Sequence, residues 1–122
     1  MTKKVFKEQQ QETREIVKQI FNLALAVNPN DTKQDTTGKK PTVFVRFSGH
    51  IAGVEVEIYH DGWDSEKECS QTRYMIYLGD DFFTESEYEP YPKEQECDQL
   101  TKAKAALAEL QKIADKWGVD YV

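Results

Sequence analysis

The chain has 122 residues, 39% of them hydrophobic and 11% aromatic, which is enough apolar material for one domain with its own core. It carries 22 Asp and Glu residues against 16 Lys and Arg residues, a formal net charge of -6 at pH 7. Nucleic acid and anionic membranes repel so acidic a chain. The net charge therefore disfavours nonspecific binding to either, and a charged partner is expected to be basic.

The two cysteines, Cys69 and Cys97, are too few and too far apart for a disulfide framework, and neither belongs to a zinc-binding pattern. We expect both to be reduced thiols. The first residues, MTKKVFKEQQQ, lack the apolar run of a signal peptide, and no stretch approaches the ~20 apolar residues of a membrane span. These features predict a cytoplasmic protein, of a bacterium or of a phage that infects one, that needs no metal and no cofactor.

The first predicted element is an amphipathic helix over residues 5–27, in which apolar residues recur at steps of three and four. They are Val5, Phe6, Ile16, Val17, Ile20, Phe21, Leu23, Ala24 and Val27. The following segment 28–41, NPNDTKQDTTGKKP, consists of turn formers and polar side chains. It predicts a flexible loop.

Two alternating stretches, TVFVRFSG from Thr42 and VEVEIYH from Val54, predict a β-hairpin with its turn near residues 48–53. A third strand is predicted at RYMIYLG, with Tyr74, Ile76 and Leu78 on one face. In the hairpin, alternation predicts the inward-facing residues Val43, Val45, Phe47, Val54, Val56, Ile58 and His60, and the outward-facing residues Arg46, Glu55, Glu57 and Tyr59.

A short fourth strand is predicted at residues 82–89. The last element is a helix that begins near Cys97, or as early as Pro92, and ends at Gly118, so that residues 118–122 form a tail. Residues 1–122 therefore form a single α+β domain. It consists of an N-terminal helix, a meander of three or four antiparallel strands and a C-terminal helix, and we expect both helices on one face of the sheet.

The charges are distributed unevenly along the chain. Residues 55–98 hold fourteen acids against Lys67, Arg73 and Lys93, a net charge of -11, whereas the other 78 residues have a net charge of +5. Glu85, Glu87 and Glu89 occupy alternate positions, so in an extended chain they project from one face about 6.7 Å apart. Neighbouring carboxylates repel each other, and an external basic partner would relieve that repulsion.

This pattern favours a non-enzymatic interaction domain that binds a basic protein surface, because aromatic side chains among charged ones are typical of interfaces. The candidate partner-binding residues are Glu55, Glu57, Asp61, Trp63, Asp64, Glu66, Glu68, Asp80, Asp81, Glu85, Glu87, Tyr88, Glu89 and Tyr91. The most specific form of this hypothesis is that the carboxylates take the place of phosphates in the nucleic-acid-binding groove of a host nuclease. Phage inhibitors of the anti-CRISPR or anti-restriction type use this strategy.

Four alternatives stay open. The acids could form only a solvated surface, or the protein could self-associate through the open sheet face. Four carboxylates between Asp61 and Glu68 suggest calcium, although the spacing and central glycine of a helix-loop-helix site are missing. Cys69 and His60 could form an activated thiolate pair, although no third orienting group is evident.

The element order, with Lys102 and Lys104 early in the last helix (TKAKAALAEL), resembles the double-stranded RNA-binding domain. This resemblance implies an RNA-binding-like module. It covers about ten residues, and the family's basic loop has no counterpart here. The segment before the helix is acidic where a phosphate would bind.

Overall fold

The computed structural model describes residues 3–28, 41–60, 62, 71–80 and 97–119. The described elements are α1 (Lys3–Val27), β1 (Thr42–Ser48), β2 (Gly53–Tyr59), β3 (Gln71–Tyr77) and α3 (Asp98–Lys116). The predicted α+β fold is confirmed, with an open antiparallel sheet between two helices in the chain. The predicted fourth strand at residues 82–89 and a helix start before Cys97 lie outside the described residues.

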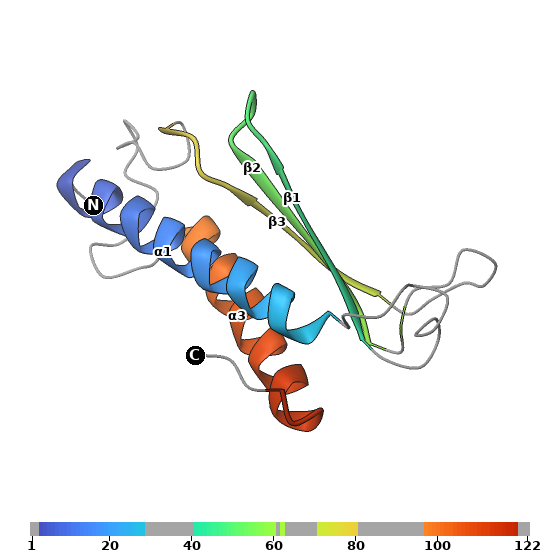
Figure 1. Cartoon of the computed structure of the whole chain (residues 1–122). Helices are drawn as coiled ribbons and strands as arrows, with labels where there is room; N and C mark the ends of the chain where they lie inside the picture. The colour runs from blue at the N-terminus through green and yellow to red at the C-terminus, as the bar shows by residue number, and fades with distance from the viewer. Residues whose placement is uncertain (1–2, 29–40, 61, 63–70, 81–96, 120–122) are drawn as a thin grey trace.

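The described sheet has the strand order β1-β2-β3, and both pairs are antiparallel. In its register Val45 lies opposite Val56, and Val56 lies opposite Tyr74. Because side chains alternate along each strand, this register gathers the apolar residues on one face of the sheet. Figure 1 shows both helices on the same side of the sheet. We call this side the inner face and the opposite side the outer face.

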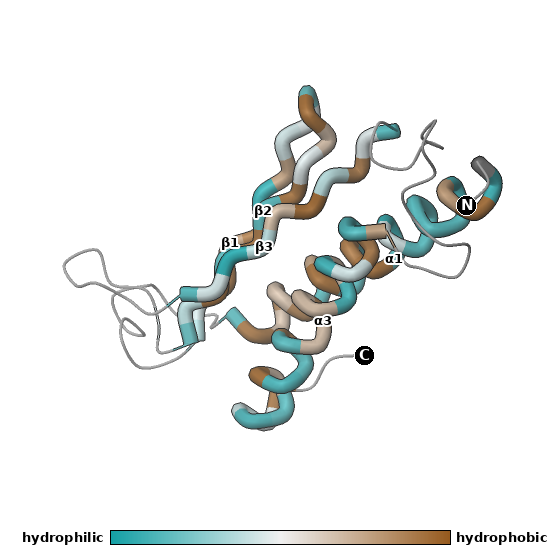
Figure 2. The backbone as a smooth tube through the Cα atoms, turned by 180° about the vertical axis from the view of Figure 1, so that it is seen from behind, coloured by the Kyte–Doolittle hydropathy of each residue, from teal (hydrophilic) through white to brown (hydrophobic). Residues whose placement is uncertain are grey.

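The core lies between the inner face and the two helices. α1 lies against β1, α3 lies against β3, and the two helices pack on each other. Apolar and polar stretches alternate along both helices and along the strands, as the brown and teal segments of Figure 2 show. The largest fully buried side chains include Ile20, Ile58, Ile76, Leu100 and Leu110. Each element thus buries one stripe of its surface, as the periodicity of the sequence predicts.

The predicted orientation of the hairpin residues holds for its central part and fails at its tip. Val54, Val56 and Ile58 are completely buried, whereas Phe47 is 58% exposed. The hairpin extends beyond the helices (Figure 1), so the inner face near its tip has no helix over it. The prediction that Phe47 faces the core is therefore wrong. Alternation predicts on which face of the sheet a side chain lies, but it does not predict whether a helix packs against that part of the face. At the other end of β2, the side chain of His60 is 39% exposed.

The ends of the predicted loop 28–41 are fixed. Asn28 Nδ2 donates to the carbonyl of Val43 at 2.9 Å, and the amide of Val43 donates to Asn28 Oδ1 at 2.7 Å. Pro41 is buried. Residues 29–40 lie outside the described part of the chain, so the prediction of flexibility stays a prediction for them.

Of the described helices, neither combines the length and the apolar character that crossing a membrane requires.

Candidate functional site

The structure places three of the fourteen candidate partner-binding residues. They are Glu55 and Glu57 on β2 and Asp80 after β3. The others lie outside the described residues: Asp61, Trp63, Asp64, Glu66, Glu68, Asp81, Glu85, Glu87, Tyr88, Glu89 and Tyr91. Cys69 and the proposed calcium ligands also lie there. For these segments the structure describes the flanking residues, and the contacts that hold those residues in place.

Glu55 and Glu57 lie on the outer face, as predicted, but they are not unneutralised. Arg46 Nη1 lies 2.9 Å from Glu55 Oε1 and 3.0 Å from Glu57 Oε1. Arg73, which lies opposite Glu57 in the register, places its Nη2 2.6 Å from Glu55 Oε2. Two arginines therefore neutralise two glutamates. For Glu55 and Glu57, internal arginines and not an external basic partner therefore relieve the repulsion that the sequence led us to expect.

The electrostatics of the outer face follow from this network. Hydrogen bonds with Glu57 and Arg73 hold the pKa of Glu55 below its ordinary value. Aromatic rings flank the network, since Phe44 and Tyr59 stack edge to face with centroids 5.7 Å apart, and Arg46 lies 5.4 Å from the Phe44 centroid. Tyr59 also donates its hydroxyl to Glu57 Oε2 at 3.1 Å. The outer face is thus rich in aromatics, arginine and glutamate and carries little net charge.

The two strongly acidic segments of the sequence leave the described sheet at opposite ends of β3. Segment 63–70 ends where β3 begins, at Gln71, and segment 81–96 begins after Asp80, beyond the other end of β3. A strand of this length separates its two ends by roughly 20 Å. The attachment points therefore do not unite the two segments into one patch, and each segment has to be considered separately.

Three glutamines fix the chain on both sides of segment 81–96, and we call Gln9, Gln10 and Gln99 the glutamine clamp. Gln10 Nε2 donates to the carbonyl of Leu78 and to Asp80 Oδ1, both at 2.9 Å. Gln9 Oε1 accepts the backbone N–H of Cys97 at 2.7 Å. The residues before and after the acidic segment are thus both attached to the same turn of α1.

Gln99 completes the clamp from α3. Its Oε1 accepts the backbone N–H of Tyr77 at 2.8 Å, and the residue is 6% exposed. A buried backbone donor left without an acceptor costs about 1–3 kcal/mol, so these bonds hold the attachment points firmly. Asp80 is exposed and accepts a neutral donor, so its charge is not cancelled by this contact.

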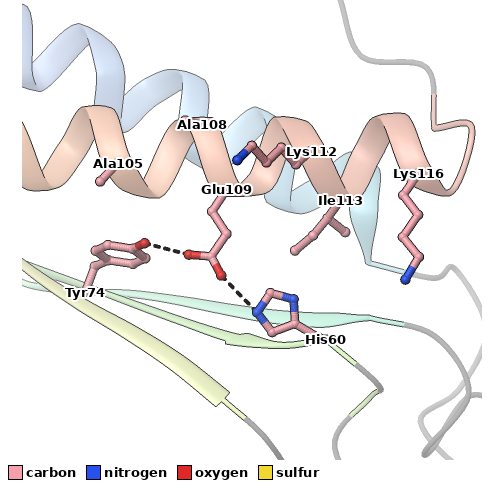
Figure 3. Close-up of a pocket in the computed structure, with 8 residues that line it drawn as sticks. All are labelled: His60, Tyr74, Ala105, Ala108, Glu109, Lys112, Ile113 and Lys116. Carbon is pink, nitrogen blue, oxygen red and sulfur yellow. Dashed lines mark hydrogen bonds and ion pairs between the residues drawn. The ribbon is translucent and has the colours of Figure 1, made fainter.

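A second constellation lies at the other end of the sheet, in a cleft between α3 and the strands (Figure 3). Glu109 of α3 points toward the sheet, where its Oε1 lies 2.9 Å from His60 Nε2 and its Oε2 accepts the hydroxyl of Tyr74 at 2.5 Å. His60 Nε2 also lies 3.2 Å from the hydroxyl of Thr72. The cleft has a volume of about 520 Å³, and Ala105, Ala108, Lys112, Ile113 and Lys116 also line it.

Two groups have pKa values raised by burial, Tyr74 in this cleft and Cys97 at the other end of α3. Burial, followed by the hydrogen bond to Glu109, raises the pKa of Tyr74 to about 12, so its hydroxyl stays protonated at neutral pH. Burial also raises the pKa of the Cys97 thiol. The two histidines lie at opposite ends of the sheet, since His50 lies in the hairpin turn and His60 follows the far end of β2.

The sequence alone did not reveal the glutamine clamp or the role of Glu109. The QQQ stretch on α1 read as part of a polar helix face, and its partners lie 68 to 88 residues away in the chain. Glu109 likewise lies 35 residues from Tyr74. The identity of a polar residue does not indicate which distant residue it bonds to. These pairs become evident only when the packing of the helices on the sheet is known.

Comparison with protein-family models, with curated proteins and with solved structures finds no match. Within the described part of the chain, no three His, Cys, Asp or Glu side chains are grouped so that they could hold a metal ion.

Proposed function

We propose that the protein is a non-enzymatic cytoplasmic interaction domain that presents segment 81–96 to a basic surface of another protein. The observation that carries this proposal is the glutamine clamp. Hydrogen bonds from α1 and α3 fix Tyr77, Leu78 and Asp80 on one side of the segment and Cys97 on the other. Binding residues are commonly carried by connecting segments that a rigid scaffold holds in position.

The composition of the segment supports a basic partner. Residues 81–96 contain six carboxylates against one lysine, together with four aromatic residues, Phe82, Phe83, Tyr88 and Tyr91. Clustered charge of one sign steers an oppositely charged partner, and desolvated aromatic side chains contribute most of the binding energy at many interfaces. The paired Glu55 and Glu57 no longer belong to this proposal as sources of free charge. Asp61, Trp63, Asp64, Glu66 and Glu68 form a separate candidate set.

In its most specific form, the proposal is that the protein inhibits a nucleic-acid enzyme of a bacterial host. The carboxylates Asp80, Asp81, Glu85, Glu87 and Glu89 would replace phosphates in the groove of the enzyme, with Tyr88 and Tyr91 as anchors. Binding of this kind depends strongly on salt, because the attraction is screened within about 10 Å at 0.1 M ionic strength and within about 3 Å at 1 M.

The test is capture of partners from a bacterial lysate at low and at high salt, followed by mass spectrometry. A triple variant, Glu85→Lys with Glu87→Lys and Glu89→Lys, is compared with the parent. The matched control carries the same change of charge on the exposed face of α1, as Glu8→Lys, Glu12→Lys and Glu15→Lys. Both variants change the net charge equally, so a difference between them reports the position of the charges.

We expect the parent and the control to retain one basic, nucleic-acid-binding protein at low salt and to release it at high salt. The triple variant in segment 81–96 is expected to lose it. Equal retention by the triple variant and the parent would refute the proposal. Equal loss by both variants would show that only the total charge matters, and would refute it as well.

Self-association through the outer face is a second candidate, favoured by the aromatic and arginine-rich network around Phe44, Arg46 and Tyr59. Contacts of this kind depend less on salt than contacts between unlike charged patches. Sedimentation at increasing protein concentration distinguishes the two candidates. A mass that rises with concentration, equally at low and high salt, would favour self-association over the acidic segment as the functional surface.

A further inference from the structure

The cleft beside His60 is formed by small side chains on α3 opposite large ones on the sheet. Ala105 and Ala108 leave space above Tyr74, and Ile113 supplies an apolar wall. The volume of about 520 Å³ lies within the ~300–1,000 Å³ typical of small-molecule sites. Figure 3 shows the apolar and polar side chains around the same hollow.

The carboxylate in this cleft already has its partners. Glu109 accepts the hydroxyl of Tyr74 and lies against His60, so both of its oxygens are engaged. The high pKa of Tyr74 keeps this hydroxyl a donor over the physiological range. These contacts occupy both oxygens of Glu109 but do not cancel its charge, so the acidic group of an anion is expected at the lysine end of the cleft, away from Glu109. They also fix His60 Nε2 against Glu109, which leaves the second ring nitrogen for other contacts (Figure 3).

Two ammonium groups, those of Lys112 and Lys116, lie on the rim of the cleft. Lys112 and Lys116 lie one helical turn apart on α3, and both are exposed. No described carboxylate lies within ion-pair distance of either lysine, whereas Lys18 and Lys104 each have one. Lysines near a helix C-terminus also interact favourably with the helix dipole, which is the simpler reason for their presence. Beside them, Ala105, Ala108 and Ile113 form the apolar part of the cleft.

We propose that this cleft binds a small organic anion, with an apolar ring-sized body against Ala105, Ala108 and Ile113 and its carboxylate or phosphate group at the rim that carries Lys112 and Lys116. The site lies at the end of the sheet opposite the attachment of segment 81–96 and does not depend on the proposed function. An ammonium pair favours either acidic group, because lysine acts as a point charge with no required donor geometry.

The experiment is a titration of the full chain, followed through the methyl NMR signals of Ala105, Ala108 and Ile113. The probes are phenyl phosphate, benzoate, inorganic phosphate and benzyl alcohol. We expect saturable shifts of these signals with phenyl phosphate or with benzoate, and the tighter of the two identifies the acidic group. Benzyl alcohol and inorganic phosphate, which each lack one half of the ligand, are expected to bind at least fivefold more weakly.

The decisive variant is Lys112→Gln with Lys116→Gln, and its matched control is Lys7→Gln with Lys102→Gln, which removes two exposed lysines elsewhere. The first variant is expected to weaken binding of the tighter probe roughly tenfold, and the control to leave it unchanged. Benzyl alcohol binding as tightly as the anions would overturn the proposal. So would a Lys112 and Lys116 variant that loses stability and keeps its affinity, since the lysines would then act on the helix dipole alone.

Discussion

Gly118 ends α3 in a left-handed conformation, with φ of 65°. The amide of Val119 donates to the carbonyl of Ala114 at 2.8 Å, and that of Gly118 donates to Asp115 at 3.3 Å, the hydrogen-bond pattern of a Schellman motif. A side chain in this conformation costs roughly 1 kcal/mol. The sequence predicted this stop correctly, because the requirement for glycine is local.

Gly118→Ala is therefore expected to lower the free energy of unfolding by about 1 kcal/mol, measured by urea denaturation. The space around the residue is open, so the loss would come from the backbone conformation and not from a clash. Gly79→Ala is the control, since Gly79 also has open space around it and does not have a positive φ. Equal losses in the two variants would contradict the explanation from φ.

Glu55 makes stability depend on pH in a defined direction. Hydrogen bonds with Glu57 and Arg73 lower its pKa in the folded state, so the folded state favours the ionised form. Its contribution is present above the unfolded pKa, about 4.5, and is lost as the pH falls through the lower folded value. Glu55→Gln is expected to be less stable than the parent at pH 7 by about 0.5–1 kcal/mol, a difference that shrinks as the pH falls below 4.5 and through the lower pKa of the folded state.

Urea denaturation between pH 7 and pH 3 measures this difference. Glu8→Gln is the matched control, because Glu8 is exposed on α1 and makes no ion pair with a described residue. If the control variant reproduced the pH dependence of Glu55→Gln, the arginine network would not be the cause.

At the scale of elements, the strands and helices were predictable because their signals are local and repeat. Alternation gave the outward positions of Arg46, Glu55 and Glu57, and in the structure Arg46 pairs with both acids across the hairpin. The second partner, Arg73, required the register of β3, which the sequence does not specify. The exposure of Phe47 required the position of the helices over the sheet. In both cases the missing information is how one element is placed relative to another.

The glutamine clamp is the element-scale feature with the clearest energetic test. Gln9→Ala removes the acceptor of the N–H of Cys97, which is 2% exposed, and is expected to cost roughly 1–3 kcal/mol of unfolding free energy. Gln11→Ala is the control on the same helix. Among the described residues, the side chain of Gln11 bonds to Glu15, an exposed contact worth about 0.2–0.5 kcal/mol. Equal losses would mean that the clamp does not hold the attachment of segment 81–96 to α1.

At the scale of the whole molecule, the division of charge remains after the network on the outer face has been taken into account. Of the fourteen acids between residues 55 and 98, Glu55 and Glu57 are paired with arginines, and ten lie in segments 61–70 and 81–96 beside Lys67 and Lys93. Where folding brings like charges closer together, their mutual repulsion opposes folding.

The effect of this repulsion on stability can be tested with the isolated protein, without a binding partner. Replacing Glu85, Glu87 and Glu89 by lysine changes the charge of segment 81–96 from -5 to +1, since six acids and one base become three and four. At low ionic strength the thermal midpoint is expected to stay equal or to rise by about 1–4 °C. At 1 M salt, where the screening length is about 3 Å, the difference from the parent should vanish. Calorimetry at both salt concentrations measures it. A lower midpoint in the variant at low salt would mean that these carboxylates stabilise the folded chain through contacts of their own, and a surface held ready for a basic partner would no longer explain them.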